Sequence, residues 1–218
     1  MIKRLPHLWV ILLVAGCAST VNTPLSTTRA DQIRGKSLVV VTHEKPSFTA
    51  ATATKAMFGA FGALAMVSEG DDIVAANDIQ DPSVEIGAKI ASSLAARYDL
   101  EPDAGPHVTA TGDIDELARQ YGHGDLILFT QTRGWGFTYF PGDWNNYRVD
   151  VNTTVRLIDA SRKAILAAAD CAYSPEYADS DQAPSHDQLL ANDAAGLKAE
   201  LKKSADYCVQ KLLSETFT

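Results

Sequence analysis

The sequence has few residues that could carry covalent or metal chemistry. Its 218 residues include three cysteines and five histidines. There is no Cys-x-x-Cys, Gly-x-Ser-x-Gly or His-Glu-x-x-His motif, and no phosphate-binding or dinucleotide-binding glycine pattern. These absences exclude the enzyme classes that the motifs mark. We therefore expect a protein that is not an enzyme and that binds neither a metal nor a cofactor.

Two histidines lie beside carboxylates, which is the minimal arrangement for acid–base catalysis. His123 precedes Asp125 in a loop, and His43 is followed by Glu44 at the end of a strand-like run. A loop histidine is more often solvated or capping than catalytic. We interpret both pairs as structural.

The sequence also lacks a cluster of lysine and arginine. Its formal net charge is −8, and an acidic chain without a basic patch repels the phosphate backbone of DNA or RNA. Nucleic acid is therefore excluded as a partner.

No apolar run reaches the roughly 20 residues that a membrane-spanning helix needs. The run near the start is short, from Leu8 to Val14, and follows the basic pair Lys3-Arg4. Small residues and Cys17 come directly after it. This order is typical of an export signal that is removed by cleavage.

Val14-Ala15-Gly16-Cys17 closely resembles the lipobox of bacterial lipoproteins. The resemblance implies cleavage before Cys17 and acylation of its thiol and new N-terminus, which would anchor the chain in a membrane through several acyl chains. Ala18 rather than aspartate follows, which by the same resemblance implies the outer membrane, with the domain facing the periplasm. An ordinary secretory signal with a chance cysteine is the alternative. Loss of residues 1–17 takes the net charge from −8 to −10.

Residues 18–35 are rich in threonine and serine and show no apolar pattern. We expect a flexible tether with a root-mean-square reach of roughly 20–25 Å. Residues 36–218 suit a single domain.

Apolar periodicity predicts the elements of this domain. Asp81-Pro82 marks a helix start, and Gly122 a helix stop. The expected fold class is α+β or mixed α/β, in the order β-α-β-α-β-β-β-α, with about five strands in a mixed sheet and helices packed on one face. The segments are strands at 36–42, 107–111, 125–139, 147–158 and 164–173, and helices at 82–98, 113–121 and 190–212.

The strands at 125–139 and 147–158 are expected to form a hairpin. Their apolar faces coincide if Phe137 lies opposite Tyr147, which places Phe129 opposite Val155.

The stretch "GWGFTYFPGDWNNYR" at 134–148 is dense in aromatic residues. Trp135, Phe137 and Tyr139 share the core side of the hairpin, so a packing role explains them. Phe140 and Trp144 fall in the turn, where the pattern buries nothing. These two are candidate contacts for a partner, a glycan or a lipid headgroup.

Cys171 is expected to face the core from the third strand of this meander, together with Ile165, Ala167 and Ala169. Cys208 lies on the apolar stripe of the C-terminal helix. With Cys17 acylated, these are the two remaining thiols in an oxidising compartment. We predict a Cys171–Cys208 disulfide, the alternative being two free buried thiols.

Residues 47–80 form an apolar, glycine- and alanine-rich insertion, with an uncharged centre at 56–67. It is either a crossover helix lying on the sheet or a surface that docks to a membrane or another subunit. On the second reading, Met57, Phe61 and Leu64 form the contact surface.

The expected order of elements resembles small envelope lipoproteins, such as the auxiliary lipoproteins of ABC-type transporters and the N-terminal domain of the Tol-system translocation protein. "NDIQDPSVEIGAKIASSLAARY" and "DWNNYRVDVNTTVRLIDASRKAIL" look like uncharacterised lipoproteins of this build. The resemblance implies a non-enzymatic, lipid-anchored accessory or scaffold protein of an envelope assembly or transport system, with a protein partner. The alternative is a periplasmic binder of glycan or lipid. The 47–72 segment departs from the simpler members.

Overall fold

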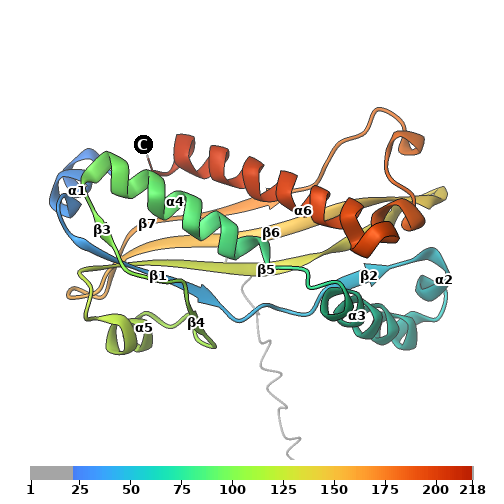
Figure 1. Cartoon of the computed structure of the whole chain (residues 1–218), viewed down its shortest axis with the longest axis horizontal. Helices are drawn as coiled ribbons and strands as arrows, with labels where there is room; N and C mark the ends of the chain where they lie inside the picture. The colour runs from blue at the N-terminus through green and yellow to red at the C-terminus, as the bar shows by residue number, and fades with distance from the viewer. Residues whose placement is uncertain (1–21, 218) are drawn as a thin grey trace, which may run out of the picture.

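The computed structural model describes residues 22–217, which form one domain around a single mixed sheet (Figure 1). This range contains six α-helices and seven strands, which confirms the expected fold class. In chain order the elements are α1 (Thr27–Ile33), β1 (Ser37–His43), β2 (Thr49–Ala51), α2 (Ala53–Ala56), α3 (Gly59–Ala76), α4 (Pro82–Tyr98), β3 (Glu101–Pro102), β4 (His107–Thr109), α5 (Ile114–Tyr121), β5 (Leu126–Phe140), β6 (Asp143–Asp159), β7 (Ala164–Tyr173), the 3₁₀ turn η1 (Ser180–Gln182) and α6 (His186–Glu215).

The sheet has the strand order β3-β1-β5-β6-β7, with β4 also pairing with β1 and β2 with β5. β1 runs parallel to β5, whereas β5, β6 and β7 form an antiparallel meander. Leu38 to Val41 in β1 are all buried, as expected of a parallel strand that is covered on both faces.

The two faces of the sheet are covered differently. α4 and α6 pack side by side over one face, and α5 lies on the opposite side (Figure 1). On that side, Leu117 of α5 packs with Ile127 and Phe129 of β5. The helices are therefore not confined to one face, because the apolar second face of β1 and β5 also needs a cover.

The helix starts follow the sequence signals. Asp81 caps α4 by accepting a hydrogen bond from the Ser83 backbone at 2.8 Å, and it also accepts one from the Thr132 hydroxyl. Asp113 caps α5 by accepting from the Glu116 backbone at 3.0 Å. Each carboxylate satisfies a backbone donor that the first helical turn leaves free.

The β5–β6 hairpin is present, but its register differs from the expected one. Phe137 pairs with Val149 and Tyr139 with Tyr147, a shift of two residues from the expected pairing of Phe137 with Tyr147. Because side chains alternate with a period of two, this shift keeps the aromatic side chains on the core face. Trp135, Phe137 and Tyr147 are accordingly buried.

A β-bulge between Thr132 and Gly134 makes the expected pairing of Phe129 wrong. Phe129 pairs with Arg156, not with Val155, and packs with α5 on the other face. The extra residue at the bulge changes the pairing register by one. In β5 before the bulge, side chains that would face one side of the sheet therefore face the other.

A second irregularity lies in the β6–β7 pair, between Leu157 and Ile158. We call the buried apolar cluster between the sheet and helices α4 and α6 the main core. Ala167, Ala169 and Cys171 face the main core as expected, but Leu166 occupies the core position expected of Ile165.

The expectation of a flexible tether over 18–35 is wrong for residues 22–35. The Thr23 and Ala168 backbones exchange two hydrogen bonds, of 2.7 and 2.9 Å, which fix this segment to β7. Leu25 and Ile33 are buried in the main core. The domain therefore begins before residue 36, because three or four apolar side chains in a polar segment are enough to dock a short helix. The expected signal at 1–17, with Cys17, lies outside the described residues.

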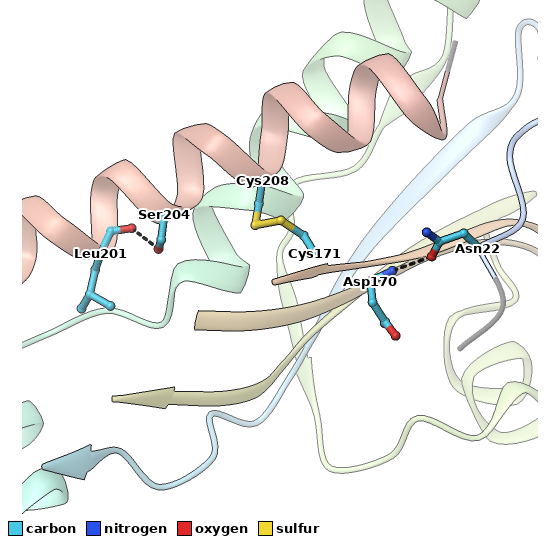
Figure 2. Close-up of a disulfide and its surroundings, with 6 residues drawn as sticks. All are labelled: Asn22, Asp170, Cys171, Leu201, Ser204 and Cys208. Carbon is cyan, nitrogen blue, oxygen red and sulfur yellow. Dashed lines mark hydrogen bonds between the residues drawn. A yellow bond between two sulfur atoms is a disulfide. The ribbon is translucent and has the colours of Figure 1, made fainter. Parts of the chain in front are cut away.

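The expected disulfide is confirmed. Cys171 of β7 and Cys208 of α6 are bonded, with a Cα–Cα distance of 5.6 Å (Figure 2). Both residues are buried in the main core between sheet and helix. The bond joins the last strand to the last helix.

Candidate functional site

The most exposed apolar side chains of the described chain gather around α2 and α3. Phe61 is 85% exposed, Met57 75%, Leu64 70% and Phe58 67%. We call these residues, together with Val67, the apolar corner. Sequence reasoning identified Met57, Phe61 and Leu64 and missed Phe58.

The corner exists because the apolar segment is not one continuous helix. α2 ends at Ala56 and α3 begins at Gly59, whose φ of +55° is strained for other residues. Phe58 lies at this break, and its side chain points outward. In one continuous helix over residues 56–67 it would point in a different direction. The sequence signal for the break was Gly59, which follows the two apolar residues Met57 and Phe58.

Only the second half of α3 lies against the sheet. A Cβ added at Gly70 would come within 1.9 Å of the Phe48 carbonyl oxygen, so α3 touches the backbone just before β2. Val74 and Phe48 are buried in one cluster with Trp135. The reading as a crossover helix is thus correct for this half and wrong for residues 59–67.

The other two candidate contacts flank the hairpin turn and do not lie in it as expected: Phe140 is the last residue of β5 and Trp144 the second residue of β6. Trp144 is 61% exposed, as expected. Phe140 is half-buried, since its ring lies edge-on to Tyr177 at 6.0 Å and the Arg148 guanidinium lies 6.0 Å above it. The turn therefore offers one exposed aromatic side chain, not two.

The turn itself is well fixed. Hydrogen bonds from the Ser180 hydroxyl, the Asn146 amide and the Asn145 backbone lower the pKa of Asp143 to about 2. The backbone next to Trp144 is thus held by three hydrogen bonds to Asp143. Figure 1 places this turn, α2 and α3 at the same end of the molecule's long axis.

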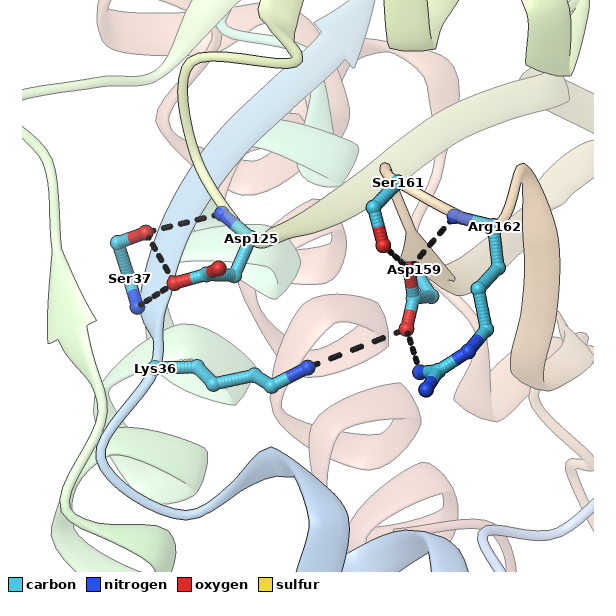
Figure 3. A network of polar contacts seen from close by, with 6 residues as sticks. All are labelled: Lys36, Ser37, Asp125, Asp159, Ser161 and Arg162. Atoms are coloured by element: carbon cyan, nitrogen blue, oxygen red, sulfur yellow. Dashed lines mark hydrogen bonds and ion pairs between the residues drawn. The ribbon is translucent and has the colours of Figure 1, made fainter.

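The residues considered for acid–base catalysis have structural partners. Asp125 accepts hydrogen bonds from the hydroxyl and the backbone of Ser37, at 2.8 and 3.1 Å, and these lower its pKa (Figure 3). Nδ1 of His43 lies 2.9 Å from the Glu44 carbonyl oxygen.

Asp159 shows the same structural use of a carboxylate. It is buried and accepts hydrogen bonds from the Ser161 hydroxyl and from the backbone and guanidinium of Arg162, while Lys36 lies 3.9 Å away (Figure 3). Burial would raise its pKa, but these partners outweigh burial and lower it. The network ties the β6–β7 turn to the start of β1.

Residues 22–217 offer neither a metal site nor a membrane-spanning helix. No group of three or more histidine, cysteine or acidic residues there could hold a metal ion. No helix in that range is long and apolar enough to cross a membrane. In the part that the structure describes, the apolar corner and Trp144 form the candidate site for contact with a partner or ligand.

No family model matches this chain, and neither does any curated protein. Among solved structures, a PelC dodecamer from Paraburkholderia phytofirmans is 15% identical over 87% of this chain and 93% of its own, with a TM-score of 0.35. Protein XCC0632 from Xanthomonas campestris is 12% identical over 90% and 92%, with a TM-score of 0.38. Lipoprotein GNA1162 from Neisseria meningitidis is 12% identical over 79% and 99%, with a TM-score of 0.27. These TM-scores lie below 0.5, so the similarity assigns no function to this chain.

Proposed function

We propose that this chain is a lipid-anchored, non-enzymatic accessory subunit of an outer-membrane assembly, and that the apolar corner binds a helical surface of another protein. The observation that carries the docking step is the exposure of the first half of α3. A helix that is apolar on all sides is normally buried, yet Gly59 to Val67 is exposed except at Gly62 and Met66.

The composition of this helix favours a protein partner over a membrane surface. A helix that lies on a membrane has a charged face opposite its apolar face. Residues 59–67 contain no charged side chain, and Lys55 beside them is paired with Glu69. A bilayer surface would cover one side of α3, whereas a partner's groove can cover several.

Small residues give the partner room. Ala60, Ala63 and Ala65 are exposed between the larger side chains of the corner. Small side chains in a contact surface let a second helix approach closely. We infer that the partner presents an apolar helix that packs between Phe61 and Leu64.

The anchor part of the proposal rests on the lipobox. Because residues from Asn22 onward are fixed to β7, only the four residues 18–21 separate Cys17 from the domain, and the five Cα–Cα steps from Cys17 to Asn22 reach at most about 18 Å. Lipidation at Cys17 would therefore hold the domain close to the membrane, where it could meet a membrane-bound partner.

The anchor is tested by metabolic labelling with a palmitate analogue in the wild type and in Cys17→Ser. We expect the label on the wild type and its loss in the variant, because the acylated thiol is absent. The disulfide cysteines are the internal control, since they remain in both chains. Equal labelling of the two chains would refute the anchor.

The docking surface is tested by site-specific photocrosslinking in cells. A benzophenone amino acid in place of Phe61 is expected to give one discrete adduct, which mass spectrometry identifies as a different envelope protein. The same group in place of Val108, which is 65% exposed on β4, should give none. Leu64→Ser in the Phe61-labelled chain should reduce the adduct at least about tenfold, if one buried apolar side chain is worth about 1.5–3 kcal/mol.

Other adducts would identify other occupants. A covalent dimer of this chain, or a lipid adduct alone, would overturn the proposal of a different protein partner.

One observation favours the second candidate, a binder of glycan or lipid. Trp144 is exposed, and a pocket of about 250 Å³ beside it is lined by Trp144, Asn145, Tyr147, Ser185, His186 and Asp187. A saturable change in Trp144 fluorescence with peptidoglycan fragments or lipids would favour this function.

A further inference from the structure

A second surface pocket, of about 460 Å³, opens on the α5 side of the sheet. Its lining comes from the N-terminal segment and from β5, β6 and β7: Thr23, Arg29, Arg133, Thr154, Arg156, Ile165 and Ala168. Three of these side chains are arginines, although the chain carries a net charge of −8. No carboxylate lines the pocket.

Arg156 is the most unusual of the three arginines. Its guanidinium lies 4.6 Å above the Phe129 ring, and Nη1 donates to the Gly112 carbonyl at 3.0 Å. Its Nε is buried and has no hydrogen-bond partner among the described residues. Buried charges and buried donors are normally paired, so the Nε–H of this side chain lacks an acceptor.

Asp170, whose charge acts on Arg156, does not supply that acceptor. Asp170 raises the pKa of Arg156 by its charge, but burial, followed by repulsion from Arg133, outweighs this and lowers the pKa. Oδ1 of Asp170 accepts the Thr154 hydroxyl at 2.5 Å. The described residues show no ion pair between Arg156 and any carboxylate.

The other two arginines are placed by irregular features of the chain. Arg133 is the extra residue of the β5 bulge and is exposed; bulges often re-aim a side chain toward a site. Arg29, in α1, donates to the Leu166 carbonyl at 2.9 Å. Within residues 22–217 neither forms an ion pair with a carboxylate. Three cations near one another, with no described carboxylate paired to them, favour an anion as the missing partner.

We propose that this pocket binds a phosphate group. Planar guanidinium groups bind phosphate through two parallel hydrogen bonds, and the Nε–H of Arg156 has no acceptor among the described residues. Pockets of about 300–1,000 Å³ hold small ligands, so a phosphate with an organic substituent fits.

Two sources could supply this group: free phosphate or a phospholipid headgroup. Thr23 lines the pocket six residues after Cys17, a reach of at most about 22 Å. If Cys17 carries the lipid anchor proposed above, the pocket lies near the headgroup layer. The choice of source rests on that proposal, whereas the site itself does not.

The test uses the full chain, ¹⁵N-labelled, in phosphate-free maltoside micelles at constant ionic strength. Inorganic phosphate and glycerophosphoglycerol, the soluble headgroup of phosphatidylglycerol, are titrated separately. We expect a saturable shift of the Arg156 Nε–Hε resonance. Tighter binding of inorganic phosphate assigns the site to free phosphate, and tighter binding of glycerophosphoglycerol assigns it to a headgroup.

Arg156 is half-buried, so its replacement could unfold the chain, and the decisive variant is Arg133→Gln. Loss of one charge-assisted hydrogen bond should weaken binding about tenfold or more. Arg119→Gln, which removes an equal charge from exposed α5, should leave the affinity unchanged. The proposal is overturned if neither ligand shifts the Arg156 resonance at millimolar concentration, or if both variants weaken binding equally.

Discussion

Replacing both Cys171 and Cys208 with serine is expected to lower the free energy of unfolding by about 4 kcal/mol. The two residues are 37 positions apart, and in the chain-entropy model a crosslink of that span removes this much freedom from the unfolded chain. For a domain of this size, the loss corresponds to a fall in Tm of roughly 10 °C. Denaturant unfolding followed by circular dichroism measures it.

Serine also removes apolar sulfur from a buried site, so the variant alone overstates the effect of the crosslink. The matched control is the wild type unfolded in a reductant, which keeps both sulfur atoms and breaks only the bond. The double variant should not respond to reductant. A wild type whose stability is unchanged by full reduction would show that the bond contributes nothing.

Phe137→Ala is expected to lower the free energy of unfolding by about 3–5 kcal/mol. Phe137 is 1% exposed, and its ring packs edge-on against Phe48, Tyr147 and His186 at centroid distances of 5.7, 5.5 and 5.7 Å. These three neighbours come from three different segments, so they cannot easily collapse into the cavity.

Trp144→Ala is the control for this experiment, because it removes a larger aromatic from the exposed turn of the same hairpin. It should change stability by less than about 0.5 kcal/mol. Both values come from urea unfolding of the oxidised proteins. Equal losses for the two variants would mean that the hairpin tip, and not the interior, holds this end of the sheet together.

Much of the fold follows from local signals that the sequence displays. Asp81 and Asp113 cap helices where expected, because each carboxylate has a backbone donor within two or three residues. The disulfide was predictable because the alternation of β7 and the stripe of α6 both point their cysteine inward. The caps, the alternation of the strand and the stripe of the helix each depend on neighbouring residues alone.

The misplaced features depend on contacts between distant segments. The bulge at Arg133 moves Phe129 to the other face, and alternation alone does not show where an extra residue is inserted. Residues 22–35 look like a tether in the sequence because their packing partners lie far along the chain. Leu25 and Ile33 can be buried only after the β7 edge and the main core have formed.

The candidate site was partly visible in the sequence. Met57, Phe61 and Leu64 stood out by their apolar character, but the break at Gly59, which exposes Phe58, is a matter of backbone conformation. The arginine pocket had no sequence signal, because Arg29, Arg133 and Arg156 come from three separate segments. Their clustering follows from the bulge and from the docking of the N-terminal segment.

The pairing of Thr23 with Ala168 has a consequence for how copies of this protein behave in a crowded compartment. β7 is the last strand of the sheet, and the unpaired backbone groups of an edge strand invite pairing with another chain. The bridge at Thr23 occupies part of that edge. The segment around Thr23 therefore also blocks the addition of another strand to the sheet. Proteolytic removal of this segment would expose the β7 edge and favour aggregation.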